Sequence, residues 1–277
     1  MSLPEPSLLE GVLRRDRLLV VAGLVVVVAL AWAWILAGAG VGMSPLTVLR
    51  EPEMPSMPGM AGMVMRPAVW TPAYALLMFL MWWVMMAAMM LPSATPMLLL
   101  YARISRGERA AGRPYVSTGI FAAGYLAAWG FFSLLAVLLQ WGLERLGLLS
   151  PMMVTTSLLL GAVILLAAGI WQLTPLKTIC LRQCRSPIGF LSQSWRPGAR
   201  GAFLMGLEHG AYCLGCCWFL MALLFFGGVM NLFWIAGLAV FVLLEKILPY
   251  GHWLAGAAGI VAIAWGAVLL LRAAGAA

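Results

Sequence analysis

Residues 73–102 read AYALLMFLMWWVMMAAMMLPSATPMLLLYA, a stretch that holds no charged side chain. As a helix rising about 1.5 Å per residue, roughly 20 apolar residues cross the ~30 Å hydrocarbon layer of a membrane. Other largely apolar runs lie near residues 18–41, 116–142, 151–176, 202–226, 229–249 and 253–272. The pattern predicts an all-α, polytopic transmembrane helix bundle of about seven helices.

The composition excludes an ordinary soluble domain, because 64% of the 277 residues are hydrophobic and only 9% are charged. The net charge of +8 does not indicate a nucleic-acid partner, since the basic residues lie mostly in short segments between apolar runs. With a cytoplasmic N-terminus, the outer segments hold only Arg50, Arg66, Arg145 and Arg272. The positive-inside rule therefore predicts a multi-pass protein of a bacterial-type inner (plasma) membrane, with the C-terminus outside and lipid around it.

The apolar runs divide the chain into three parts. Residues 1–42 hold a basic segment and the first helix, residues 43–72 an outer Met-rich loop, and residues 73–272 a six-helix metal-binding membrane domain. The first helix could instead be a signal peptide cleaved near Ala37-Gly38-Ala39. Its apolar core is longer than that of a signal peptide, so we expect the helix to be retained.

Soft sulfur is abundant, with 19 methionines and five cysteines. In the predicted outer loop, Met54, Met57, Met60 and Met63 recur at every third residue, and the Pro and Gly residues between them prevent a regular helix. Thioethers on a flexible strand suit Cu(I), and the spacing is similar to the methionine motifs of copper importers. The alternative is a loop that lies on lipid headgroups or caps the bundle.

Residues 73–102 carry two stripes of methionine, which either fill gaps in the packing or bind a soft metal. The candidate ligands among them are Met85, Met86, Met89 and Met90. Pro92 and Pro96 lack the N–H groups that an unbroken helix requires. We expect them to break this helix in its inner half and to leave carbonyl groups that must find partners or line a cavity.

Residues 206–218 read GLEHGAYCLGCCW and carry the most specific signal. An ionised carboxylate within a span costs on the order of 2.5–3.5 kcal/mol, so an apolar helix has no structural need for one. On a helical wheel, three candidate ligands lie within about 60° of one another and two lie at opposite edges of that face. The three are His209, Cys213 and Cys216, and the two are Glu208 and Cys217.

Imidazole and thiolate together suit Cu(I) or zinc. One helix strings these ligands over about 10 Å, so a second helix must contribute, and the methionines of residues 73–102 lie at matching depth. The alternative has the cysteines as small buried residues, His209 bonded to a carbonyl and Glu208 paired with an arginine.

Two further candidates lie towards the predicted inner side. Cys180 and Cys184 stand among basic residues that favour thiolate, which indicates metal capture or redox exchange in a cytoplasmic segment. The alternative is an amphipathic helical turn packed on the bundle. Glu245 either pairs with Lys246 at the membrane interface or faces Glu208 or His209.

Four of these stretches together resemble the family of predicted metal-binding integral membrane proteins that carry a domain of unknown function. The stretches are residues 81–96, 176–187 and 206–218 and the pair Glu245-Lys246. The resemblance runs from Met78 to about Pro249 and leaves out the loop at Met54 to Met63. It implies metal binding by the Met, Cys and His positions named above, and it supplies no reaction.

The sequence therefore predicts a membrane protein that binds Cu(I) and translocates it or hands it over, with a copper donor or acceptor protein as partner. Zinc is the alternative metal. No GxxxxGK[ST] motif is present, so ATP bound to this chain does not drive transport. The competing hypotheses are a membrane oxidoreductase using the metal or the thiols, and a metal-delivery factor for a membrane enzyme. An enzyme is less favoured because no flavin, nicotinamide or haem signature is present.

Overall fold

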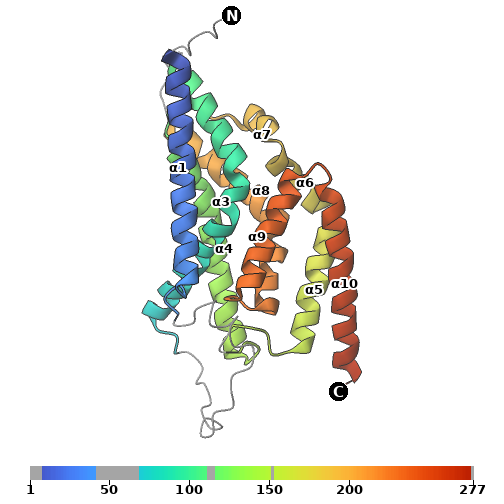
Figure 1. The fold of residues 1–277 in the computed structure, drawn as a ribbon. Helices are drawn as coiled ribbons and strands as arrows, with labels where there is room; N and C mark the ends of the chain where they lie inside the picture. The colour runs from blue at the N-terminus through green and yellow to red at the C-terminus, as the bar shows by residue number, and fades with distance from the viewer. Residues whose placement is uncertain (1–7, 42–68, 111–115, 151–152, 276–277) are drawn as a thin grey trace, which may run out of the picture.

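The computed structural model describes residues 8–41, 69–110, 116–150 and 153–275, and it confirms the all-α class (Figure 1). The helices in these residues are α1 (Leu8–Leu36), α3 (Pro72–Ala110), α4 (Thr118–Arg145), α5 (Leu158–Leu173), α6 (Pro175–Arg185), α7 (Pro187–Ser194), α8 (Gly198–Gly227), α9 (Leu232–Ile247) and α10 (Gly251–Gly275). The long helices run side by side, and the start of α1 and the end of α10 lie at opposite ends of the bundle.

Length and hydropathy identify five candidate membrane spans among the described residues: α1, α3, α4, α8 and α10. The pair α5 and α6 would add a sixth, but it is bent by 65° at the junction. The sequence predicted about seven spans, and the difference arises from helices that are shorter than the apolar runs containing them. The cytoplasmic placement of the N-terminus remains a prediction.

The predicted helices at 151–176 and 229–249 are corrected to α5 and α9, each of 16 residues. Ser157 caps α5 by accepting a hydrogen bond from the backbone N–H of Leu160. Asn231 caps α9 in the same way, from the N–H of Phe233. These side chains satisfy amide groups at the helix start, so each helix begins later than its apolar run. At about 1.5 Å per residue, each is roughly 24 Å long and falls short of the hydrocarbon thickness.

The expected break at Pro92 and Pro96 is also corrected, because α3 is one continuous helix of 39 residues through both prolines. Neighbouring hydroxyl groups bond to carbonyls in this turn. Ser93 Oγ donates to Met90 O at 2.9 Å, and Thr95 Oγ1 donates to Leu91 O at 3.0 Å. Such local partners let prolines occur inside membrane helices without interrupting them.

The crossing of α4 and α8 positions the candidate site. Helices α4 and α8 pack together extensively, with glycine at the crossing point. A Cβ atom on Gly206 would lie 2.0 Å from the carbonyl oxygen of Phe121, and one on Gly124 would lie 2.0 Å from that of Phe203. Only the absence of side chains lets the backbones approach so closely. The crossing brings Tyr125 of α4 against the cysteines of α8.

Replacing Gly206 by alanine should lower the free energy of unfolding by about 1–3 kcal/mol, because the new methyl group collides with backbone that cannot move aside cheaply. Thermal unfolding of the purified protein in detergent would measure the loss. Gly237→Ala in α9 is the matched control, because a Cβ there meets no atom within 4 Å. Equal melting temperatures for the two variants would contradict the tight crossing.

Candidate metal centre

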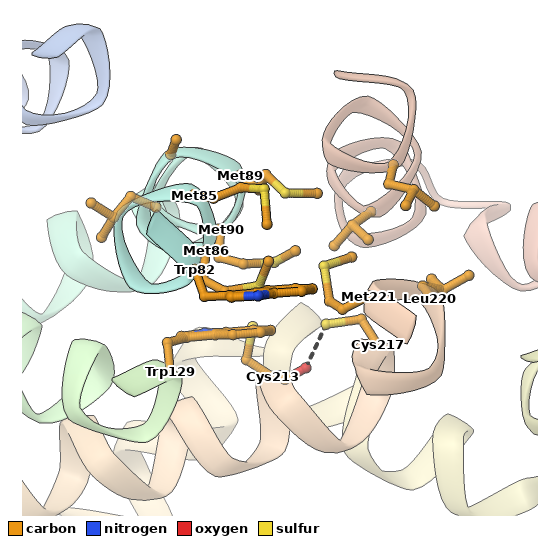
Figure 2. Packing of buried hydrophobic residues seen from close by; sticks show 14 of the residues in the cluster. Trp82, Met85, Met86, Met89, Met90, Trp129, Cys213, Cys217, Leu220 and Met221 are labelled. Carbon is orange, nitrogen blue, oxygen red and sulfur yellow. Dashed lines mark hydrogen bonds between the residues drawn. The ribbon is translucent and has the colours of Figure 1, made fainter. Parts of the chain in front are cut away.

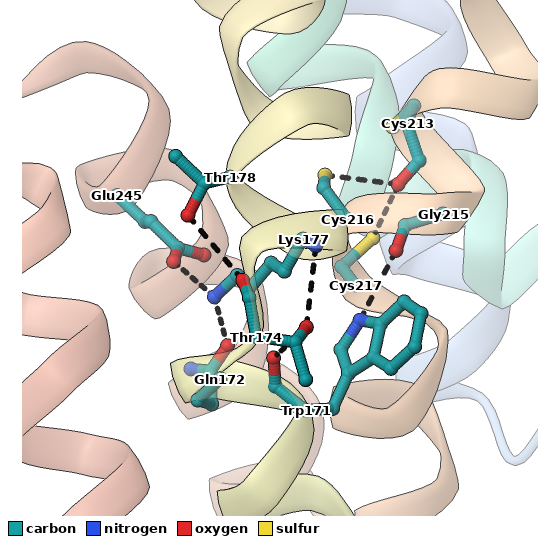
Figure 3. A network of polar contacts seen from close by, with 10 residues as sticks. All are labelled: Trp171, Gln172, Thr174, Lys177, Thr178, Cys213, Gly215, Cys216, Cys217 and Glu245. Carbon is teal, nitrogen blue, oxygen red and sulfur yellow. Dashed lines mark hydrogen bonds and ion pairs between the residues drawn. The ribbon is translucent and has the colours of Figure 1, made fainter.

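The three cysteines of α8 lie in the interior of the bundle, and none is more than 1% exposed. Figure 3 shows the thiols of Cys216 and Cys217 turned back towards the preceding turn of their own helix. Their sulfur atoms donate to the carbonyl oxygen of Cys213 at 3.0 and 2.9 Å. Both bonds are local and weak, so either thiol can be released by rotation about its Cα–Cβ bond.

Cys213 is the point where four helices meet. Its sulfur lies 3.0 Å from the hydroxyl of Tyr125 on α4 and accepts a hydrogen bond from Lys246 Nζ on α9, also at 3.0 Å. The same ammonium group donates to Ser93 Oγ on α3 at 3.0 Å. Lys246 is only 8% exposed and makes no salt bridge to any described carboxylate. A buried ammonium beside a sulfur atom favours the negatively charged thiolate over the neutral thiol.

The two cysteines of α6, which the sequence treated as a separate candidate, lie beside this group. The side chain of Cys184 lies near those of Cys213 and Cys216. A Cβ atom on Gly215 of α8 would lie only 2.8 Å from the sulfur of Cys180. We call the five cysteines Cys180, Cys184, Cys213, Cys216 and Cys217 the thiol cluster.

The bend between α5 and α6 brings the two halves of the thiol cluster together. Thr174 lies between the helices, ends α5 and caps α6 by accepting from the N–H of Lys177, with Pro175 in the first turn of α6. Proline at that position is compatible with a helix start but not with continuation of α5. The Thr174-Pro175 pair was therefore a usable signal for a turn, and the sequence reasoning passed over it.

A buried ion pair fastens α6 to α9. Lys177 bonds both to Glu245 and to Gln172, and each of these side chains is at least 94% buried (Figure 3). The sequence reasoning offered Lys246, Glu208 or His209 as the partner of Glu245, and the salt bridge to Lys177 corrects that choice. On the other side, Trp171 Nε1 donates to Gly215 O at 3.1 Å and ties α5 to α8.

Glu208 points away from the thiol cluster. Its carboxylate accepts from Arg196 at 3.1 Å and from Ser194 at 3.3 Å, and its side chain is 29% exposed. An ion pair in that position satisfies the charge near the surface of the bundle, as in the alternative reading of the sequence.

His209 lies one helical turn before Cys213 and is 3% exposed. Its ring sits among those of Phe121, Tyr125 and Phe190, with centroids 6.2, 5.8 and 5.3 Å away. Its Nδ1 atom is buried and has no hydrogen-bond partner among the described residues. An unpaired imidazole nitrogen at this depth is a candidate ligand, since buried polar atoms normally have partners.

The methionines of α3 lie beside the thiol cluster. Figure 2 shows them gathered in the space that also receives Cys213, Cys217 and Met221 from α8. Met221 is completely buried, and the sequence reasoning did not select it. The predicted positions on α3, each at most 1% exposed, are Met85, Met86, Met89 and Met90.

Other predicted positions lie elsewhere. Pro92 and Pro96 line an apolar cavity of about 710 Å³ between α1, α3 and α9. The loop methionines Met54, Met57, Met60 and Met63 lie outside the residues that the structure describes.

Among the described residues, no group of three or more His, Cys, Asp or Glu side chains is arranged to hold a metal ion. A tetrahedral zinc site needs four such ligands. A soft monovalent ion is less demanding, because a pair of thiolates is enough to hold it.

Comparison with known proteins gives one match. Residues 79–269, more than half of the chain, match the family PpoB2, which is described as a copper chaperone family. No curated protein and no solved structure matches the chain. The matched region contains the whole thiol cluster and the α3 methionines, and it bears out the metal-related family that the sequence motifs suggested.

Proposed function

The chain belongs to the PpoB2 family of copper chaperones, and on that premise we propose that it holds Cu(I) within the membrane on two thiolates, that of Cys213 and that of Cys184 or Cys216. It then passes the ion to an acceptor protein. The family and the apolar helices indicate a copper-related membrane protein. The proposal adds the position of its copper site, on α6 and α8.

The observation that carries this proposal is the 3.0 Å contact between Lys246 Nζ and Cys213 Sγ. A Cu(I) ion held by two thiolates carries one net negative charge, and the ammonium group neutralises it. Charges in an apolar interior are tolerated only when they are paired and hydrogen-bonded. Thiolate, metal ion and ammonium together therefore form a neutral unit that the interior can hold.

Loading the site requires small movements of the thiols. Cys216 gives up its bond to the carbonyl of Cys213 and turns towards the nearby Cys184. Each thiol that binds the metal releases its proton, so copper affinity rises with pH. Cys217 and Cys180 flank the ligands and offer exchange positions through which the ion leaves.

The α3 methionines and Met221 form the second part of the proposed path. Thioethers bind Cu(I) without losing a proton and carry no charge, so they hold the ion less firmly than thiolates. An ion arriving at Met85, Met86, Met89 or Met90 would therefore move towards the thiol cluster. We place the loop methionines Met54 to Met63 at the start of this path and His209 at its far side.

Replacing Lys246 by methionine should lower the affinity for Cu(I) about 10- to 100-fold, because the charge of the copper–thiolate unit is then uncompensated. A competition titration with a chromophoric Cu(I) chelator, under anaerobic reducing conditions, measures this affinity. Glu208→Gln is the control, since Glu208 is engaged by Arg196 away from the thiols. Unchanged affinity in Lys246→Met would argue against a buried thiolate site.

Delivery and translocation are separated by a vesicle experiment. Reconstituted protein that transfers Cu(I) to a soluble thiol acceptor on the side where it was loaded, with no copper inside the vesicle, behaves as a chaperone. Copper accumulating inside would show translocation instead.

A further inference from the structure

A polar cavity, distinct from the thiol cluster and from the apolar cavity at Pro92 and Pro96, lies between α6 and the start of α10. It has a volume of about 510 Å³, within the range of small-molecule sites, which is roughly 300–1,000 Å³. Its lining residues are Gln172, Lys177, Thr178, Leu181, Arg182, Arg185, Ser186, His252 and Ala255.

The lining is rich in hydrogen-bond donors and cations. Lys177, Arg182 and Arg185 contribute three positive charges, and none of the described lining residues is acidic. The carboxylate of Glu245, which pairs with Lys177, also lies close to Arg185 and Lys246. One carboxylate cannot balance these cations, so the cavity has an excess of positive charge.

Arg182 is the cation with no partner. Its side chain is exposed and makes no hydrogen bond or ion pair to the described residues. Arg185 donates to the carbonyl oxygens of Leu248 and Pro249 at 2.6 and 3.0 Å, which fixes its side chain at the rim. A fixed guanidinium beside a free one is a common arrangement for binding a phosphate or carboxylate group.

A buried hydrogen-bond donor in the lining also indicates a ligand with acceptor oxygens, such as a phosphate or carboxylate group. Gln172 is 94% buried, and its amide nitrogen Nε2 has no hydrogen-bond partner among the residues that the structure describes. Lys177 sets the orientation of this amide, because its ammonium group donates to Oε1 of Gln172. In the flipped orientation, the amide N–H groups would face the N–H groups of Lys177. Figure 3 shows the nitrogen on the side of the amide away from Lys177. An unpaired buried N–H calls for an acceptor atom in the cavity.

We propose that this cavity binds a phosphate group through Arg182, Arg185 and the amide nitrogen of Gln172. Phosphate offers several acceptor oxygens and up to two negative charges, which matches a lining made of donors and cations. The volume leaves room for an organic part attached to it. A lipid headgroup and a soluble phosphate compound share this chemistry, and the site does not involve the cysteines.

The experiment uses the full-length protein in an uncharged detergent. Inorganic phosphate is titrated while the thermal unfolding midpoint is followed, and native mass spectrometry counts bound dioleoylphosphatidylglycerol against dioleoylphosphatidylcholine. Arg182→Gln should weaken binding of the recognised probe about tenfold. Arg200→Gln, an exposed arginine outside the cavity lining, is the matched control and should bind like the parent protein.

Selective retention of phosphatidylglycerol would identify a lipid headgroup as the ligand, and stabilisation by inorganic phosphate would identify a soluble source. Either result supports the site if Arg182→Gln alone loses it. Binding of neither probe, or equal loss in both variants, would overturn the proposal. Cu(I) binding by the same samples is scored separately, so this outcome does not depend on the proposed copper function.

Discussion

Cys213→Ser is expected to lower the affinity for Cu(I) by more than about 100-fold, the largest functional effect of any single substitution in this chain. Loss of a partner that merely supports a ligand already costs about 10- to 100-fold, and Cys213 is proposed as a ligand itself. A serine hydroxyl is a hard donor that does not ionise at neutral pH, so it cannot replace thiolate. Copper content per chain and chelator competition measure the loss.

Cys180→Ser is the matched thiol control for this experiment. Cys180 is half-buried and lies against Gly215 at the edge of the thiol cluster. We expect this variant to retain copper within a few-fold of the parent protein. If Cys213→Ser binds copper as tightly as Cys180→Ser does, Cys213 is not a ligand.

Glu245→Gln should cause the largest loss of stability, about 3–5 kcal/mol, because it leaves the ammonium group of Lys177 buried without its counter-charge. Both side chains are almost completely inaccessible, at 2% and 1% exposure. The loss should free α6 from α9 and so disturb the position of Cys184. Unfolding in detergent, followed by circular dichroism, reports the free energy.

Two comparisons make that result interpretable. Glu208→Gln removes a carboxylate from the more exposed pair with Arg196 and should change stability by less than about 1 kcal/mol. The double variant Lys177→Met/Glu245→Leu removes both charges and should recover most of the stability lost in Glu245→Gln. If the double variant is less stable than Glu245→Gln, the ion pair itself stabilises the fold, and the loss in Glu245→Gln is not simply the cost of an unpaired buried ammonium group.

The sequence was most informative where local pattern decides structure. Uncharged apolar runs predicted the long helices, because a membrane helix must satisfy its backbone internally and face lipid with apolar side chains. Helical periodicity placed His209, Cys213 and Cys216 on one face of α8, and all three are buried. These conclusions needed only the neighbours of each residue along the chain.

The contacts that shape the candidate site join residues far apart in sequence. Lys246 and Cys213 are 33 residues apart, and Lys177 and Glu245 are 68 apart. No periodicity within a single helix specifies which buried lysine meets which acid or thiol. The bend of 65° at Thr174 and Pro175 brings α6 against α8, so the cysteines of α6 lie next to those of α8.

X-ray absorption at the copper K-edge of the Cu(I)-loaded, full-length protein tests the central claim most directly. The proposed site predicts a coordination shell of sulfur atoms alone, and no defined copper signal from a Cys184→Ser/Cys213→Ser variant loaded under the same conditions. A shell dominated by nitrogen or oxygen, or an identical spectrum from that variant, would contradict a copper site shared by the thiols of α6 and α8.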